Sequence, residues 1–233
     1  MLEHTSKQFD LELESLRTRV LQMGGLVEQQ FRLAMEGLYS GEIADLERVI
    51  VGDARVNQLE VELDEACTQV IAKRQPTAID LRMITTVIKT IADLERIGGK
   101  AQKIAKLGVR LYDQHASFAP EVELRHTADL ALTMLRAALD AFARLDAAAA
   151  ADVVYKDEQV DMEHNAITRQ LITFMMEDPR TISQSLDIMA IAKAVERVGD
   201  HAKNIAEYVI YMVKGRNVRH VPPEELDREI NEH

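Results

Sequence analysis

The chain of 233 residues is long enough for one large domain or two small ones, and its 47% of hydrophobic residues can supply a buried core. A net charge of −11 argues against a basic groove for nucleic acid, and the one cysteine, Cys67, can form no intramolecular disulfide, which fits a reducing compartment. The polar start MLEHTSKQFDLELES is unlike a secretion signal and no run of about 18 apolar residues occurs, so we expect a cytoplasmic protein without membrane insertion.

The first half of the chain predicts three long helices, because Pro and Gly, which end helices, are scarce. The helices should cover residues 5–39, with Thr5 or Ser6 as the cap, 42–74 and 77–113. Ser40-Gly41 and Gln75-Pro76 separate them. With Trp absent and Ala, Leu, Glu and Arg plentiful, this pattern indicates an all-α fold.

The second half predicts three more helices, after a connector at residues 115–120. The helices should cover residues 121–145, 147–177 and 181–214. Asp178-Pro179 separates the last two, and Gly215 ends the sixth. A charged tail with Pro222-Pro223 follows, and we expect it to be a partly ordered extension.

The two halves of the chain repeat each other. The segment IADLERIGGKAQKIAKL at 91–107 aligns with AKAVERVGDHAKNIAEY at 192–208, a shift of 101 positions. The identical pairs are Glu95/Glu196, Arg96/Arg197, Gly98/Gly199, Ala101/Ala202, Ile104/Ile205 and Ala105/Ala206. Upstream, GDARVNQLE at 52–60 aligns with KDEQVDMEH at 156–164. We therefore expect six long helices in two tandem homologous three-helix bundles, at 1–116 and 117–216, followed by the tail at 217–233.

The predicted sixth helix has an apolar seam and a polar stripe. The seam residues alternate at spacings of three and four: Ile188, Ile191, Val195, Val198, Ala202, Ile205, Val209 and Met212. This seam should face the core, which places Glu196, Asp200, Lys203 and Glu207 on the outward side, with Asn204 at its edge. One interpretation of the stripe is a solvated face with ion pairs inside the helix.

A metal site is the alternative interpretation of the stripe. Asp157 and Asp161 on the fifth helix, and Glu196 and Asp200 on the sixth, are acidic pairs at i, i+4, a spacing that costs roughly 0.2–0.5 kcal/mol in repulsion. The two pairs fall at corresponding points of adjacent helices, where a cation between them would offset that repulsion. Oxygen ligands suit Mg²⁺, Mn²⁺, Fe or Zn²⁺, and the spacing does not choose among them.

Four further residues have structural explanations. Gly98 and Gly199 lie in mid-helix, where each costs roughly 1 kcal/mol relative to Ala, and we expect close helix packing at both. Cys67 has no basic neighbour nearby in the sequence, so we expect a buried small hydrophobic residue and not a nucleophile. His201 is expected at the surface.

The segment VERVGDHAKNIAEYVIYMVKGRNVRH at 195–220, with its echo LERIGGKAQKIA at 94–105, resembles the PhoU family of bacterial phosphate signalling. The resemblance covers almost the whole chain, including the opening MLEHTSKQFDLELESLRTRVLQMG and the DxxVN and DxxVD segments. It implies two three-helix bundles and, commonly, a homodimer.

The resemblance also implies a function. Members of the family are non-enzymatic adaptors in the cytoplasm, and they work beside the phosphate ABC transporter, with its ATPase subunit, and a membrane-bound sensor histidine kinase. They hold the kinase in its repressing mode when phosphate is plentiful and restrain phosphate uptake. No organic cofactor and no nucleic-acid partner is implied.

Many members of the family bind metal through a motif E/D-x-x-x-D-x-x-x-D, once per repeat. The second repeat here reads Glu196-x-x-x-Asp200-x-x-x-Asn204, whereas the first, at 95–103, has Gly and Lys in place of both Asp ligands. The resemblance therefore implies one weak or labile site, in the second repeat, for a divalent or trivalent metal. The expected ligands are Asp157, Asp161, Glu196, Asp200 and Asn204.

Two rival functions stay open. A carboxylate-bridged di-metal enzyme would use inward-facing Glu-x-x-His motifs, for which Glu123-x-x-His126 and Asp161-x-x-His164 are the candidates. A purely structural helical scaffold is the second rival. No Gly-rich phosphate cradle is present, so direct phosphate sensing is not predicted.

Overall fold

The protein is described here by a computed structural model, which covers residues 2–113, 122–219, 221 and 225–226. Its helices are α1 (Leu2–Ser40), α2 (Ile43–Arg74), α3 (Ala78–Asp113), α4 (Arg125–Arg144), α5 (Ala147–Glu177) and α6 (Ile182–Lys214), with a short 3-10 turn, η1 (Pro179–Thr181), before α6. The described residues form no strand. The predicted all-α class with six long helices is confirmed.

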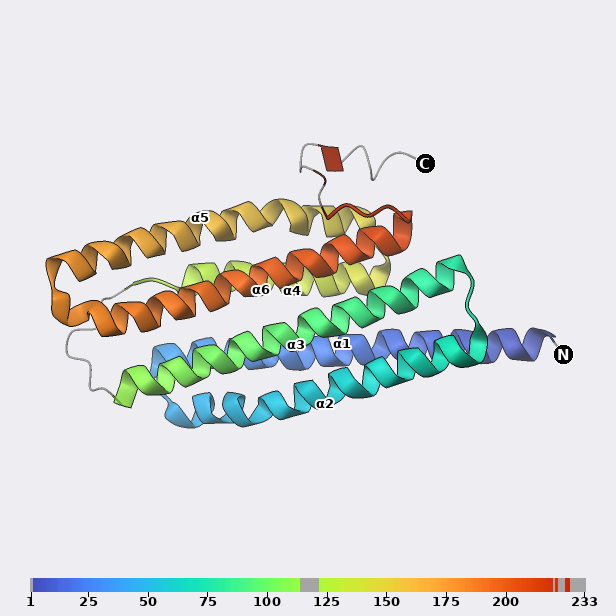
Figure 1. Cartoon of the computed structure of the whole chain (residues 1–233), viewed down its shortest axis with the longest axis horizontal. Helices are drawn as coiled ribbons and strands as arrows, with labels where there is room; N and C mark the ends of the chain where they lie inside the picture. Colours follow the sequence, from blue (N-terminus) through green and yellow to red (C-terminus); the bar gives the residue numbers. More distant parts are fainter. Residues whose placement is uncertain (1, 114–121, 220, 222–224, 227–233) are drawn as a thin grey trace.

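Two three-helix bundles lie side by side (Figure 1). α1, α2 and α3 pack on one another in the first bundle, and α4, α5 and α6 in the second. α3 packs against α6 along much of its length and runs in the opposite direction, while α1 and α4 make a smaller contact (Figure 1). The α3–α6 interface therefore determines how the two bundles meet.

The apolar seam of α6 is buried throughout, from Ile188 to Met212, as its spacing predicts. The predicted outward position of the stripe is wrong for Glu196 and Glu207, which are only 7% and 6% exposed. The prediction that His201 lies at the surface is also wrong, because its side chain is 12% exposed. The physical reason is that α6 contacts α3, α4 and α5, so its polar side is partly covered as well.

Two predicted helix starts differ from the structure. α1 already runs through Thr5 and Ser6, since a capping residue favours a helix start without preventing an earlier one. α4 begins at Arg125 and not at residue 121, which lies outside the described residues together with the predicted connector. The Glu123 side chain accepts a hydrogen bond from the Arg125 backbone N–H at 2.6 Å, and such a local bond competes with an earlier helical turn.

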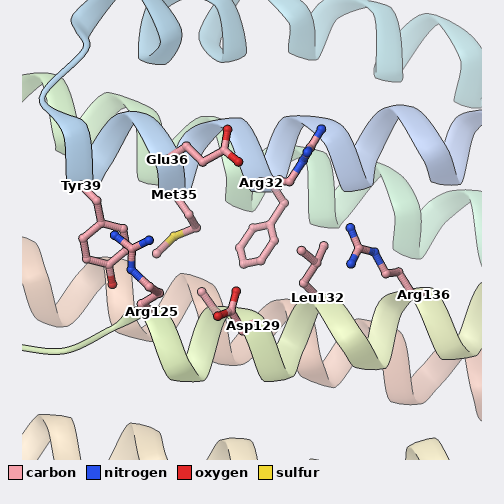
Figure 2. A pocket seen from close by; sticks show the side chains of 10 residues that line it. Arg32, Met35, Glu36, Tyr39, Arg125, Asp129, Leu132 and Arg136 are labelled. Carbon is pink, nitrogen blue, oxygen red and sulfur yellow. The ribbon is translucent and has the colours of Figure 1, made fainter.

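A groove lies between α1 and α4, where the bundles are less closely packed (Figure 2). Its volume is about 250 Å³, and Phe31, Met35 and Leu132 give it an apolar floor. The Arg125 guanidinium lies 4.4 Å from the centroid of the Tyr39 ring. The charged lining residues are of both signs: Arg32, Arg125 and Arg136 with Glu36 and Asp129. The lining therefore selects neither anions nor cations.

The tail contributes to the core through two of its described residues. Val218 is 3% exposed and Leu226 is 1% exposed. Part of the segment after α6 is therefore packed against the helices. None of the described helices is both long and apolar enough to cross a membrane.

The two mid-helix glycines of the repeat lie where helices approach closely, as predicted. A Cβ on Gly98 would lie 3.1 Å from Cγ1 of Val56 on α2, and a Cβ on Gly199 would lie 3.3 Å from Cγ1 of Val160 on α5. Both valines are buried and β-branched, so their side chains have little freedom to move. The same close Gly–Val contact therefore joins the second and third helices of each bundle.

Substituting adjacent glycines should separate packing from helix propensity. Gly99→Ala, with nothing within 4 Å of the new Cβ, should stabilise the fold by about 0.5–1 kcal/mol. Gly98→Ala should be about 1–3 kcal/mol less stable than Gly99→Ala, because it overpacks the contact with Val56. Urea denaturation of both variants measures the difference. Equal stabilisation by the two substitutions would show that the α2–α3 contact is not tight.

Candidate metal centre

Three carboxylates from two helices converge in the second bundle. Asp161 lies on α5, and Glu196 and Asp200 lie one turn apart on α6. One oxygen of each lies within 4.8 Å of the others. Two oxygens bound to one cation at about 2.4 Å can be at most about 4.8 Å apart, so the spacing fits a shared ion. Among the described residues, no second group of three or more acidic, His or Cys side chains meets this spacing.

Glu196 is the most buried of the three. Its Oε1 accepts a hydrogen bond from Nζ of Lys193, one turn earlier on α6. Its Oε2 is buried and accepts no hydrogen bond within the described protein, although Nε of Arg197 is 3.7 Å away. A buried carboxylate oxygen without a hydrogen bond is costly, and a cation at the cluster would relieve that cost.

The ion pairs expected of a solvated face are present as well. Lys193 pairs with Glu196, and Nη1 of Arg197 donates to Oδ2 of Asp200 at 2.8 Å. The side chains of Lys193 and Arg197 are about half exposed, at 43% and 51%. The two interpretations of the stripe are therefore compatible, because each α6 carboxylate that faces Asp161 also has a cation beside it.

The pKa of the Asp161 carboxyl is raised above its ordinary value. Partial burial is the largest cause, and the carboxylates of Asp157, Asp200 and Glu196 add to it, while Lys203 opposes it. The cluster is thus electrostatically unfavourable when all its members are ionised.

The other two predicted ligands do not join the three carboxylates. Asp157 is 6% exposed, and its Oδ2 accepts a hydrogen bond from Nζ of Lys203 at 2.6 Å. Burial acts to lower the pKa of Lys203, but its hydrogen bond and charge interaction with Asp157, together with the charges of Glu207 and Asp200, raise it overall. Asn204 points to the other bundle, where its Nδ2 donates to Oδ1 of Asp93 at 3.3 Å. The helical spacing placed these residues near the cluster but could not assign their partners.

Asn204 contacts a residue that was not predicted from the sequence, Asp93. Asp93 on α3 is 1% exposed and lies 2.7 Å from Nδ1 of His201 and 3.5 Å from Nη1 of Arg96. A signal was present, because Thr86, Thr90 and Asp93 follow each other at helical spacing within an apolar segment. All three are buried where α3 meets α6.

The corresponding place in the first repeat has no such cluster. Asn57 stands where the second repeat has Asp161, and it donates to Oδ2 of Asp53 at 3.4 Å. Gly99 stands where the second repeat has Asp200. Of the three aligned positions, only that of Glu95 therefore has a carboxylate, and the first repeat lacks the counterparts of Asp161 and Asp200.

The candidate motifs of a di-metal enzyme do not converge. His164, three residues after Asp161, is not part of the three-carboxylate group. Glu123 and His126 are exposed, and Nε2 of His126 lies 4.0 Å from Oε1 of Glu163. The Glu-x-x-His pattern thus places no second metal ligand set inside a bundle.

The fold and the site together define a duplicated helical-bundle protein with one carboxylate cluster between two antiparallel helices. A family model described as the PhoU domain matches residues 20–108 and 124–209. The chain belongs to the PhoU family.

Curated relatives of the chain carry names from phosphate transport. The chain is 46% identical over 229 residues to the phosphate-specific transport system accessory protein PhoU of Escherichia coli (strain K12), covering 97% of this chain and 93% of the relative. It is 43% identical over 230 residues to the corresponding homolog of Pseudomonas aeruginosa, covering 99% and 95%.

Solved structures confirm the fold. A crystal structure of PhoU from Pseudomonas aeruginosa matches with a TM-score of 0.86 at 44% identity, covering 89% of this chain and all of that one. The phosphate transport system regulatory protein PhoU from Streptococcus pneumoniae matches with a TM-score of 0.83 at 30% identity, covering 90% and 99%.

Removing one charge from the cluster should change how stability depends on pH. A raised carboxyl pKa means that the folded state holds its proton more tightly, so stability is lost as pH rises from the ordinary value of 3.8 through the raised pKa. Asp161→Asn should therefore melt at a higher temperature than wild type near neutral pH without metal, and the gap should narrow as pH falls. Thermal melts across pH measure this. Two results would contradict this prediction: a difference in melting temperature that does not change with pH, or a difference equal to that caused by Asp152→Asn, an exposed change on the same helix.

Proposed function

We propose that this chain is a non-enzymatic regulatory adaptor of phosphate homeostasis. The observation that supports the proposal is family membership over nearly the whole chain, together with relatives named as accessory proteins of the phosphate-specific transport system. In this proposal the adaptor acts in the cytoplasm, as a homodimer, between the ATPase subunit of the phosphate ABC transporter and the sensor histidine kinase. It lowers both phosphate uptake and expression of phosphate-starvation genes.

The proposed mechanism is differential binding. A signal passes through an adaptor only if the adaptor binds two states of a partner with different affinity. The long helices offer extended surfaces for such contacts, and the sequence repeats at 1–116 and 117–216 are proposed as the two structural units. The tail at 217–233 is proposed as a separate element that follows them.

The cluster of Asp161, Glu196 and Asp200 is proposed to hold a divalent or trivalent cation, with Mg²⁺, Mn²⁺, Fe and Zn²⁺ as candidates. The spacing of the three oxygens, the unsatisfied Oε2 of Glu196 and the all-oxygen donor set fit such an ion. When bound, the ion would supply charge neutralisation and a link between α5 and α6. Asp157 and Asn204 would keep their present hydrogen bonds and would contribute to the site without contacting the ion.

Metal binding should stabilise the wild-type chain and not a variant without the cluster. After chelation, adding Mn²⁺, Zn²⁺ or Mg²⁺ separately should raise the melting temperature, by the equivalent of about 2.7 kcal/mol at 100 times the dissociation constant. Glu196→Gln/Asp200→Asn should abolish the rise. Asp152→Asn/Glu158→Gln, two exposed changes on α5, should retain it. A rise that survives in the cluster variant for every ion would reject the site.

The adaptor function should be visible in cells. A strain without the chain should express a phosphate-starvation reporter in high phosphate, and wild-type chain should restore repression. Purified chain should bind the soluble sensor region of the kinase, and comparing wild type with Glu196→Ala/Asp200→Ala, with and without chelator, tests whether the cluster organises that contact. Normal repression in the deletion strain would reject the adaptor and favour a structural scaffold.

A further inference from the structure

Positive side chains gather where α3 begins and α6 ends. Gly215 ends α6, and a Cβ added to it would lie 2.6 Å from Nη1 of Arg82 on α3. Lys89, two turns further along α3, has its Nζ 5.4 Å from the ring centroids of both Tyr208 and Tyr211. We call this region the α3–α6 basic surface, and its cations are Arg82, Lys89, Lys214, Arg216 and Arg219.

Arg82, Lys89, Lys214 and Arg219 form no ion pair within 4.0 Å with a carboxylate among the described residues. Other cations of the chain, such as Lys100 and Lys103, share this, whereas Arg74, Arg110 and Arg197 are paired. Nε of Arg82 is buried without a hydrogen-bond partner. The nearby carboxylate of Glu207, whose pKa burial raises, is only 6% exposed. The charge of Arg219 interacts with Glu207, and Arg82, Lys89 and Lys214 are partly exposed, so this end of the interface carries a local excess of positive charge.

The repeat shows that these cations are not required by the packing of α3 on α6. The shift of 101 positions pairs Arg82 with Ser183 and Lys89 with Ala190, so the opposite end of the same interface packs without them. There, Arg110 forms an ion pair with the buried Asp187. At the basic surface the position equivalent to Asp187 is Thr86, which offers no charge. The cation excess at one end is thus a feature beyond what the interface needs.

The chemistry of the surface fits a carboxylate-rich ligand. Arginine guanidinium groups bind carboxylates in a planar, two-point geometry, and partly exposed tyrosines add contact area at low entropic cost. Tyr208 and Tyr211 are both partly exposed beside Lys89. A bilayer of anionic lipids or a nucleic acid would also meet the rest of a chain with net charge −11 and be repelled. A short acidic segment meets only the basic surface.

We propose that the α3–α6 basic surface docks an acidic segment of a partner protein. The proposal rests on the adaptor function for its biological meaning, and it adds where one partner binds and by what chemistry. Because the contact is between charges near the surface, it should set the association rate and weaken with salt.

A binding experiment on the full chain tests the surface directly. The probe is fluorescently labelled poly-L-glutamate, measured by polarisation at low and high salt. Wild type should bind it at low salt, and Lys214→Glu/Arg219→Glu should bind at least tenfold more weakly. The control is Lys106→Glu/Arg169→Glu, which makes the same charge change at two exposed cations elsewhere and should stay within twofold of wild type. Lys89→Gln, a milder change, should weaken binding about threefold, and circular dichroism shows whether each variant is folded.

Four results would overturn the proposal. The first three are no binding of the probe to wild type, equal loss of binding in the control variant, and retention of wild type on vesicles of phosphatidylglycerol that poly-L-glutamate does not displace. The fourth concerns a small anion. Inorganic phosphate is included as a competitor, at a concentration equal to that of the carboxylate groups of the probe. If phosphate displaced the probe fully, the surface would be assigned to a small anion and the acidic segment would be rejected.

The same variants in cells separate this proposal from the adaptor function. If deletion of the chain releases the reporter and Lys214→Glu/Arg219→Glu fails to restore repression while the control variant restores it, both proposals hold. If the surface variant restores repression fully, the adaptor stands and the docking surface is rejected. If deletion leaves repression normal, the adaptor proposal is rejected, and the binding of poly-L-glutamate still tests the docking surface.

Discussion

Buried carboxylates fix the register in which the two bundles meet, and Asp93 is the one with the least exposed surface. Asp93 on α3 has almost no exposed surface, and a buried ionised carboxylate is tolerated only when hydrogen-bond donors surround it. Its closest partners come from the other bundle, since Nδ1 of His201 lies at 2.7 Å and Nδ2 of Asn204 at 3.3 Å. Sliding α3 along α6 by one turn would remove both partners and leave the buried carboxylate with Arg96 of its own helix, 3.5 Å away.

The same constraint connects the bundle interface to the candidate metal centre. Glu196 and Asp200 face α5, while His201 and Asn204, next along the same helix, face α3. α6 is therefore shared by both sites, and a rotation or translation of α6 that tightened the cluster would also alter the donors of Asp93. A rigid helix with a functional group on each side is a physical route by which partner binding at one bundle could affect the other, provided that α6 has two stable positions.

Helix number and most helix bounds could be predicted from the sequence, because Pro76, Pro179 and Gly215 end helices by local chemistry. The burial of Glu196 and His201 could not, since an apolar seam reveals the face toward one neighbour and α6 has three. Three of the five predicted ligands converge. Asp157 and Asn204 do not, because Lys203 and Asp93 offer them direct partners, and such competition depends on tertiary contacts that spacing along a helix does not contain.

Comparison of the two repeats separates what the fold requires from what one site requires. Gly98 and Gly199 keep the same contact with a valine in both bundles, so close packing was retained twice. The carboxylate pair was retained once, because Gly99 aligns with Asp200 and Lys103 with Asn204. A packing contact is needed wherever the bundle exists, whereas a repulsive acidic cluster lowers stability unless something compensates it. The first repeat also has acidic side chains near this place, since the charges of Asp64 and Glu95 add to burial in raising the pKa of Glu60, but they do not meet the spacing of the second-repeat cluster. The spacing of the carboxylates, and not their acidity alone, therefore distinguishes the two repeats.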